Sequence, residues 1–174
     1  MTALSQEEAF ARIRLLRSPN IGPVSYHQLL RRFGTAVLAL EALPDLAARG
    51  GGQYRIAPED RVVREVSAVR AAGARYLFHD GADYPAMLGE LDSAPPILTC
   101  RGDAALGARP CVAIVGARNA SAAAVKLARQ FAGELSDAGF VVVSGLARGI
   151  DGAAHRAALA GGTIGVIASG IDIA

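Results

Sequence analysis

The sequence contains few of the residue types on which several classes of protein depend. It has no tryptophan, two cysteines, and a single lysine, Lys126, among its 18 basic residues. Cys100 and Cys111 lack the spacing of a zinc site, which indicates small buried residues in a reducing compartment. No apolar run approaches the roughly 20 residues needed to cross a bilayer, and the start has no signal-peptide pattern. These absences predict a cytoplasmic protein without a metal site or a membrane anchor.

The residues that are present indicate a globular protein. The chain has 174 residues, of which 52% are hydrophobic and 20% are charged, and this length fits one or two domains. All basic residues except Lys126 are arginine. Arginine suits bidentate contacts with phosphate, although a GC-rich genome gives the same bias. A net charge of +2 permits a nucleic-acid partner without requiring one.

The first part of the chain, residues 1–72, has the periodicity of helices and no strand pattern. Ser5 and Glu8 have the spacing of a capping box, and the segment "SPNIGP" separates the first helix from a second over residues 24–34. Further helical patterns follow, over residues 35–43 and 58–73. The sequence therefore predicts a small all-α domain over residues 1–72.

The second part, residues 73–174, alternates between strand and helix patterns. Two short strands are expected at "RYLF" (75–78) and "ILTC" (97–100). The remaining elements follow in the order strand 111–116, helix 121–138, strand 140–145, helix 151–161 and strand 163–169. Such continuous β-branched strands predict a doubly wound, Rossmann-like α/β domain with helices on both faces of a parallel sheet. Because the last expected strand ends close to residue 174, the sheet is expected to be incomplete and the chain to be a fragment.

Two loops of this domain have the composition of an anion site. They are "GARNAS" (116–121) and "SGLARGID" (144–151), and each contains one arginine, Arg118 or Arg148. Ligands of open parallel sheets bind beyond the carboxyl ends of the strands. Helices that open at good N-cap residues would add backbone amides and a partial positive charge. The predicted phosphate-binding residues are Gly116, Ala117, Arg118, Ser121, Ser144, Gly145, Arg148, Gly149 and Asp151.

Enzymatic interpretations of these loops have less support. The first loop is G-x-R-x-x-S and not G-x-G-x-x-G, and no Walker A loop is present, so no nucleotide cofactor is expected. Ser144 lies outside a G-x-S-x-G motif. Asp151 and His155 could share a helix face, but an N-cap aspartate with a packed histidine is the simpler interpretation. Three alternatives stay open: a mononucleotide pocket, a groove for a nucleic-acid backbone, and an adaptor that binds anions only adventitiously.

The N-terminal helices give a second indication of nucleic-acid binding. Asn20 and Gly22 stand where a helix-hairpin-helix motif has its two glycines, and asparagine tolerates the positive φ of such a turn. Arg31 and Arg32 on the following helix could assist in contacting DNA. A plain helical packing unit explains the same pattern equally well.

Several segments together resemble the DprA/Smf family of DNA-processing proteins. The segments are "VAIVGARNAS", "GFVVVSGLARGIDGAAHRAALAGGTIGVIASGID", "DYPAMLGELDSAPPILTCRGD" and "NIGPVSYHQLLRRFG". The resemblance implies an extended Rossmann fold behind a sterile-alpha-motif-like (SAM-like) helical domain. It also implies a single-stranded DNA binder of natural transformation, which protects incoming DNA and helps to load the RecA recombinase without enzymatic turnover. A homodimer is implied for the full-length protein, and its RecA contacts are expected mainly beyond residue 174.

The resemblance assigns roles to individual residues. The family's G-S-R phosphate loop matches Gly116, Ala117 and Arg118, with alanine in place of the serine, and its second basic position matches Arg148. Further matching residues are Ser144, Gly145, Gly149, Asp151 and His155. The main rival is a Rossmann-like nucleotide phosphoribohydrolase. Such an enzyme needs a later glycine-threonine loop with a catalytic glutamate, and the sequence contains no such string.

Overall fold

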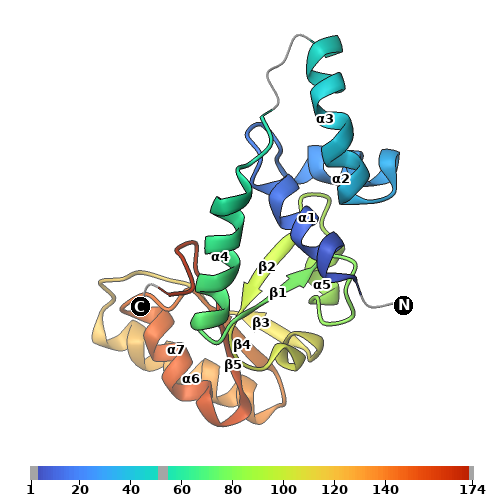
Figure 1. Cartoon of the computed structure of the whole chain (residues 1–174). Coiled ribbons are helices and arrows are strands. Elements are labelled where there is room, and N and C mark those ends of the chain that lie inside the picture. The colour runs from blue at the N-terminus through green and yellow to red at the C-terminus, as the bar shows by residue number, and fades with distance from the viewer. Residues whose placement is uncertain (1–3, 51–54, 173–174) are drawn as a thin grey trace. The chain divides into compact units, whose positions relative to one another are not determined.

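The computed structural model describes residues 4–50 and 55–172 and divides into two compact units, Met1–Arg101 and Gly102–Ala174 (Figure 1). The N-terminal unit combines helices with a short two-stranded sheet. Its elements are α1 (Gln6–Leu16), α2 (Pro23–Phe33), α3 (Ala36–Gly50), α4 (Glu59–Ala71), β1 (Arg75–Phe78), α5 (Ala86–Gly89) and β2 (Ile97–Cys100). The strands β1 and β2 pair antiparallel, with Arg75 opposite Cys100. Their limits are those expected from the sequence.

Local signals set the ends of the first two helices. The Ser5 hydroxyl accepts a hydrogen bond from the Glu8 amide at 3.1 Å and caps α1. Gly34 ends α2 with a φ of 81°, and Asn20 adopts the predicted left-handed conformation, with a φ of 66°. The Glu8 carboxylate does not complete a capping box: it accepts a hydrogen bond from the Ala36 amide at 2.9 Å. Glu8 therefore joins α1 to the start of α3.

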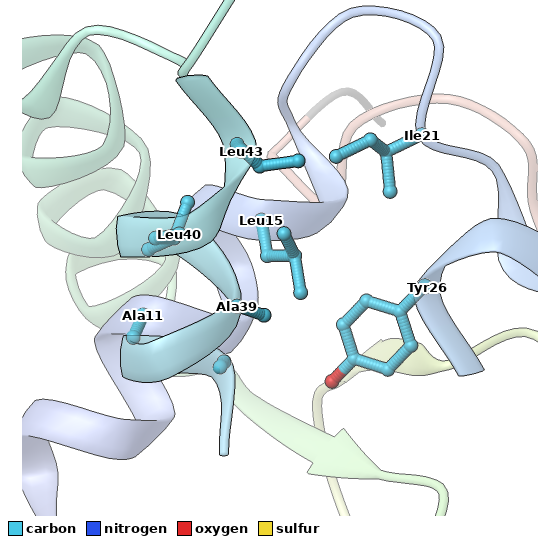
Figure 2. Close-up of a cluster of buried hydrophobic side chains, with 8 residues drawn as sticks. Ala11, Leu15, Ile21, Tyr26, Ala39, Leu40 and Leu43 are labelled. Carbon is cyan, nitrogen blue, oxygen red and sulfur yellow. The ribbon is translucent and has the colours of Figure 1, made fainter. Parts of the chain in front are cut away.

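The N-terminal unit has two hydrophobic clusters. The first lies among α1, α2 and α3 and includes Leu15, Tyr26 and Leu43, all at most 2% exposed (Figure 2). Burial of each such side chain contributes about 1.5–3 kcal/mol. The second cluster joins α1 and α4 to the strands; its buried residues are Ile13, Ala57 and Val62, with Tyr76, Phe78 and Ile97 packed against them. This packing places β1 and β2 in the N-terminal unit.

The C-terminal unit is a three-stranded parallel sheet with two helices. Its elements are η1 (Ala104–Ala108), β3 (Cys111–Ala113), α6 (Ala122–Asp137), β4 (Val141–Ser144), α7 (Ile150–Ala158), η2 (Leu159–Gly161) and β5 (Thr163–Gly165). The strand order is β3-β4-β5, and Val143 of the central strand lies opposite both Ala113 and Ile164. The predicted Rossmann-like α/β class is confirmed. The strands are shorter than predicted, because the chain leaves the sheet after Ala113 and Gly165 to form loops.

Both connecting helices cover one face of this sheet. Successive right-handed crossovers that advance in one direction place their helices on the same side, and α6 and α7 lie next to each other in Figure 1. Alanines make this close packing possible: Ala132, Ala154 and Ala158 are buried against Val142. The expectation of helices on both faces is therefore wrong for the part of this unit that the structure describes.

The boundary between the two compact units lies further along the chain than the boundary predicted from the sequence. The predicted boundary, between residues 72 and 73, follows the change from helix to strand, whereas the compact units divide after Arg101. The domain limits stay a prediction. Over the two described ranges of the chain, no helix has both the length and the apolar composition required to span a membrane.

Candidate functional site

The two predicted loops lie in contact at the carboxyl edge of the parallel sheet. They follow β3 and β4, which are neighbours in the sheet. The Ile150 amide donates to the Ala117 carbonyl at 3.3 Å, which ties the second loop to the first. Gly149, with a φ of 81°, packs against the backbone of the first loop: a Cβ there would lie 2.6 Å from the Arg118 oxygen and closer still to the Ala117 oxygen. Only glycine fits this contact.

A second close approach involves Gly116. A Cβ on Gly116 would lie 2.6 Å from Cγ1 of Ile150, so the Ile150 side chain occupies the space that a side chain at residue 116 would need. Sequence reasoning explained Gly116 by a backbone requirement but did not single out Ile150. The only sequence signal for the role of Ile150 was its position as an apolar residue directly after Gly149. The two loops are thus held together by one hydrogen bond and two glycine contacts.

The guanidinium groups of Arg118 and Arg148 are the cations of this edge. Both residues are exposed, and neither makes an ion pair or hydrogen bond with any residue that the structure describes. Arg109 of the same unit differs: its guanidinium donates to the carbonyls of Gly161 at 2.7 Å and Gly139 at 3.1 Å. The donors and the charge of Arg118 and Arg148 are therefore not used by any residue that the structure describes.

The N-terminus of α6 contributes backbone donors beside Arg118. Ser121 is the N-cap, as predicted, and its hydroxyl accepts from the Ala124 amide at 3.2 Å. The amides of Ala122 and Ala123 have no acceptor within the described ranges. A 16-residue helix adds a partial positive charge at this end. The start of α6 therefore favours an anion.

The N-terminus of α7 differs from the prediction. Gly149 is its N-cap, and Asp151 lies within the first turn, so the expected N-cap role of Asp151 is wrong. The Ile150 and Gly152 amides already donate to carbonyls of the two loops. The expectation of free amides at both helix starts therefore holds for α6 and holds in part for α7, where the Asp151 amide has no acceptor among the described residues. The first loop supplies the Ala117 carbonyl as acceptor for the Ile150 amide, and the turn before α7 supplies the Ala147 carbonyl for the Gly152 amide.

Asp151 is a buried carboxylate beside Gly145 of the second loop. It is 7% exposed, and its Oδ1 is buried without a hydrogen-bond partner among the described residues. Its Oδ2 lies 2.9 Å from where a Cβ on Gly145 would be. A carboxylate in the first turn of a helix interacts favourably with the helix dipole. The Asp151 carboxylate therefore leaves no room for a side chain at residue 145, and a direct contact of Asp151 with phosphate stays a prediction.

Ser144 and His155 are also buried. The Ser144 hydroxyl donates to the Ile114 carbonyl at 2.6 Å and joins β4 to the chain beyond β3. His155 Nδ1 lies 2.7 Å from the Thr163 hydroxyl, which itself donates to the Val142 carbonyl at 2.7 Å. Because the only proton of that hydroxyl is used, Nδ1 of His155 must be the donor in its bond. Both side chains form hydrogen bonds within the C-terminal unit, and their contact with DNA stays a prediction.

Leu146 is a feature of the site that sequence reasoning missed. It is 58% exposed and adopts a φ of 58°, a conformation that costs a non-glycine residue about 1–2 kcal/mol. Its side chain packs over Gly165, where a Cβ would lie 2.6 Å from Leu146 Cδ1. Val115 and Val166 are also exposed just beyond their strands. The glycines of the second loop were the only signal of its unusual backbone.

The predicted accessory residues Arg31 and Arg32 lie in the N-terminal unit. Both are exposed in the last turn of α2, and the Arg32 guanidinium lies 5.2 Å from the centre of the Phe33 ring. Their contact with DNA stays a prediction.

Two family models match the chain. The model for "DNA recombination-mediator protein A" matches residues 75–174, and that for a "DprA-like N-terminal HHH domain" matches residues 6–68. Protein Smf of Synechocystis is 38% identical over 57% of this chain and 26% of its own length. DNA processing protein DprA of Streptococcus pneumoniae is 44% identical over 52% of this chain and 32% of its own. DNA processing protein DprA of Bacillus subtilis is 35% identical over 64% of this chain and 39% of its own length. The chain thus spans between about a quarter and two fifths of these curated relatives.

Solved structures of similar proteins agree with these matches. The X-ray structure of DprA from Streptococcus pneumoniae superposes with a TM-score of 0.68 at 27% identity, over 99% of this chain and 61% of that one. A structure of DNA processing protein A from Helicobacter pylori gives a TM-score of 0.50 at 30% identity, over 58% of this chain and 45% of that one. That structure describes the single-stranded DNA binding mode of the Helicobacter pylori protein.

Proposed function

Since the chain belongs to the family of DNA recombination-mediator protein A, we propose that its C-terminal unit binds single-stranded DNA through phosphate contacts of Arg118 and Arg148. The observation that carries the proposal is the presence of two exposed guanidinium groups that have no partner among the described residues, on two loops that contact each other. The single-stranded DNA bound by the Helicobacter pylori relative supports the choice of ligand. The amides at the start of α6 are proposed to bind the same backbone.

The proposed mode of binding follows from the position of the loops. The tips of neighbouring strands are about 4.8 Å apart, so two long arginine side chains can reach successive phosphates of one extended strand. Contacts to phosphate carry no direct sequence information. Recognition is therefore proposed to be independent of base sequence and strongly dependent on salt.

The wider role is proposed from membership of the family. The protein is proposed to act in DNA processing during natural transformation, to protect incoming single strands and to help load the RecA recombinase. Homodimer formation is proposed for the whole protein. Binding without turnover is also proposed, and it is supported by the Ser144 hydroxyl, which is buried and already donates to the Ile114 carbonyl.

Alanine variants test the assignment of the site. Arg118→Ala and Arg148→Ala are each expected to weaken binding to every single-stranded oligonucleotide by similar factors, measured by fluorescence anisotropy. Each lost phosphate contact should also reduce the slope of log K against log salt concentration by about 0.7. Arg129→Ala is the matched control, since Arg129 is an exposed arginine of α6 outside the loops. If both loop variants bind like the parent at low salt, this assignment is wrong.

A separate assay tests the proposed absence of turnover. The rival prediction, a nucleotide phosphoribohydrolase, requires release of free base from nucleoside monophosphates. The proposal expects none on prolonged incubation with the full chain, measured by chromatography. Release that increases with protein concentration, and that is lost in Arg118→Ala, would favour the enzyme.

A further inference from the structure

A row of four rings joins α2 to the β1–β2 connection (residues 79–96) within the N-terminal unit. The rings follow one another in the order Tyr26, His27, His79 and Tyr84, with centroids 5.5, 4.9 and 5.2 Å apart. The first two rings belong to α2 and the last two to the connection. Such edge-on and tilted arrangements are favourable between aromatic rings. The step from α2 to the connection is therefore made by two imidazoles, the side chains that titrate near neutral pH.

His27 contacts both ends of the β1–β2 connection. Its ring lies edge-on to that of His79, the first residue of the connection, and it forms a hydrogen bond with the backbone of Ala94 near the other end. The ring of His79 is itself fixed, because its Nε2 lies 3.2 Å from the Gly89 carbonyl. A carbonyl only accepts, so Nε2 of His79 carries a proton. One side chain of α2 thus contacts the two ends of the connection at the same time.

Solvent has access to both imidazoles. His27 and His79 are half-buried, and both line an open pocket of about 260 Å³. Residues of α1, α2 and the β1–β2 connection form the walls of this pocket. A proton can therefore reach His27 from solvent while the unit is folded.

The groups that face His27 oppose its protonation. Burial has the largest effect, and the ring of His79 and the guanidinium of Arg31 add to it, so the pKa of His27 lies below its ordinary 6.5. The Ala94 backbone and the Asp80 carboxylate act in the opposite direction and are outweighed. Neutral His27 is therefore the form that fits the folded unit.

The neighbouring elements do not supply a carboxylate for a charged His27. From α1, the Arg12 guanidinium donates to Glu8 at 2.9 Å and to Asp80 at 2.6 Å. The carboxylate of the connection that acts on His27, that of Asp80, is thus already paired with Arg12. The two tyrosines of the row stay neutral, because burial raises the pKa of each above its ordinary 10.0. A protonated His27 would therefore add a charge beside Arg31 that this part of the unit compensates poorly.

We propose that the contact between His27 and His79 is a pH-sensitive switch, in which neutral His27 holds the β1–β2 connection against α2 and protonated His27 releases it. Since the pKa of His27 is lower in the contact than in solvent, the contact is fully stable above pH 6.5 and weakens as the pH falls towards the lowered value. The release is confined to the connection, because α2 stays packed on α1 and α3 through the cluster that contains Leu15 and Leu43. This switch is independent of the phosphate contacts proposed above.

Hydrogen exchange of backbone amides, measured by NMR on the full chain at pH 7.5 and pH 5.5, tests the switch. The reporters are the amides of Tyr84, Gly89 and Ala94, which donate to carbonyls within the connection. The reference is the amide of Ala39 in α3, which donates to the Thr35 carbonyl at 3.0 Å. Protection factors, which correct for the effect of pH on a free amide, should fall about threefold or more at the reporters on going to pH 5.5. At Ala39 they should change by less than about twofold.

Two substitutions of His27 and one control identify the group that titrates. His27→Phe keeps a ring against His79, and His27→Gln keeps a polar side chain; neither residue titrates, so both variants should lose the pH dependence at the reporters. Tyr84→Phe is the matched control. Its hydroxyl donates to the Pro95 carbonyl at 2.7 Å, so this variant should lower the protection of the reporters by the same factor at both pH values and keep the pH dependence of the parent.

The ring resonances of His27 give a direct measurement of its protonation. They should titrate with a midpoint below pH 6.5, over the same pH range in which the reporters lose protection. The proposal is overturned if the protection of the reporters is equal at the two pH values, or if it falls by the same factor at Ala39. It is also overturned if the pH dependence of the parent persists in either folded variant of His27.

Discussion

The contact between the two loops can be tested by substitution of Gly149. At this residue φ is 81° and ψ is −124°, a combination in which a side chain is strained by about 1–3 kcal/mol. In addition, a Cβ would lie within 3 Å of the Arg118 backbone, so the first loop must move. We expect Gly149→Ala to lower the free energy of unfolding of the C-terminal unit by about 3 kcal/mol or more.

Gly139→Ala separates the strain of the backbone from the contact between the loops. Gly139 also has a positive φ, of 92°, but a Cβ there would meet no atom within 4 Å. Only the strain of the left-handed conformation applies, about 1–2 kcal/mol. For a domain of this size, each kcal/mol shifts the unfolding temperature by about 4–8 °C. Gly149→Ala should therefore unfold at least about 4 °C below Gly139→Ala.

The same pair of variants tests the proposed DNA site. Well below both unfolding temperatures, Gly149→Ala should bind a single-stranded oligonucleotide about tenfold more weakly, because its first loop carries Arg118 away from Arg148. Gly139→Ala should bind within about twofold of the parent. Both quantities can be measured on one preparation, by thermal unfolding and by anisotropy. Equal losses of stability in the two variants would refute the reasoning about the loop contact. Equal affinities would refute the dependence of binding on it.

Two further predictions concern one side chain in each unit, Glu65 in the N-terminal unit and Ser121 in the C-terminal unit. Burial acts to raise the pKa of Glu65, but hydrogen bonds and charge from Arg17 outweigh it and lower the pKa below the ordinary 4.5. The resulting stability is complete above 4.5 and is lost as the pH falls through the lowered value. The free energy of unfolding, measured with urea at several pH values, should therefore fall less below about pH 5 in Glu65→Gln than in the parent. An equal fall in the two proteins contradicts this prediction. Ser121→Ala should lower the free energy of unfolding by about 1 kcal/mol. Ser121→Asp keeps an acceptor for the Ala124 amide and should lower that free energy much less. Equal reductions in the two variants contradict the capping role of Ser121.

Much of the fold could be predicted because its signals are local. Ser5, Ser121 and Gly34 mark helix ends through bonds or dihedral angles that involve only neighbouring residues. The strands at residues 75–78 and 97–100 could be located by their β-branched and aromatic composition. The contact between the two glycine loops was also predictable, since parallel strands joined by helices end at one edge of a sheet.

Other features could not be predicted, because they depend on partners distant in the sequence. The Glu8 carboxylate accepts from the Ala36 amide, 28 residues away, and the Ile150 amide of α7 donates to Ala117. Each of these bonds replaces a local arrangement that the sequence pattern favoured. Asp151 was expected to cap α7 from outside, and it is buried in the first turn of that helix because Gly149 takes the cap.

By itself, the amino-acid sequence determined the α/β class, the family and the two arginine-containing loops, because strand and helix periodicity, glycines and N-cap residues act over a few positions. Only the tertiary structure decided that the Ile150 amide of α7 donates to the first loop, that both helices cover one face of the sheet, and that the Tyr26 hydroxyl is buried without a hydrogen-bond partner among the described residues. The physical reason is that hydrogen bonding and burial depend on which groups the whole fold brings within about 3 Å of one another.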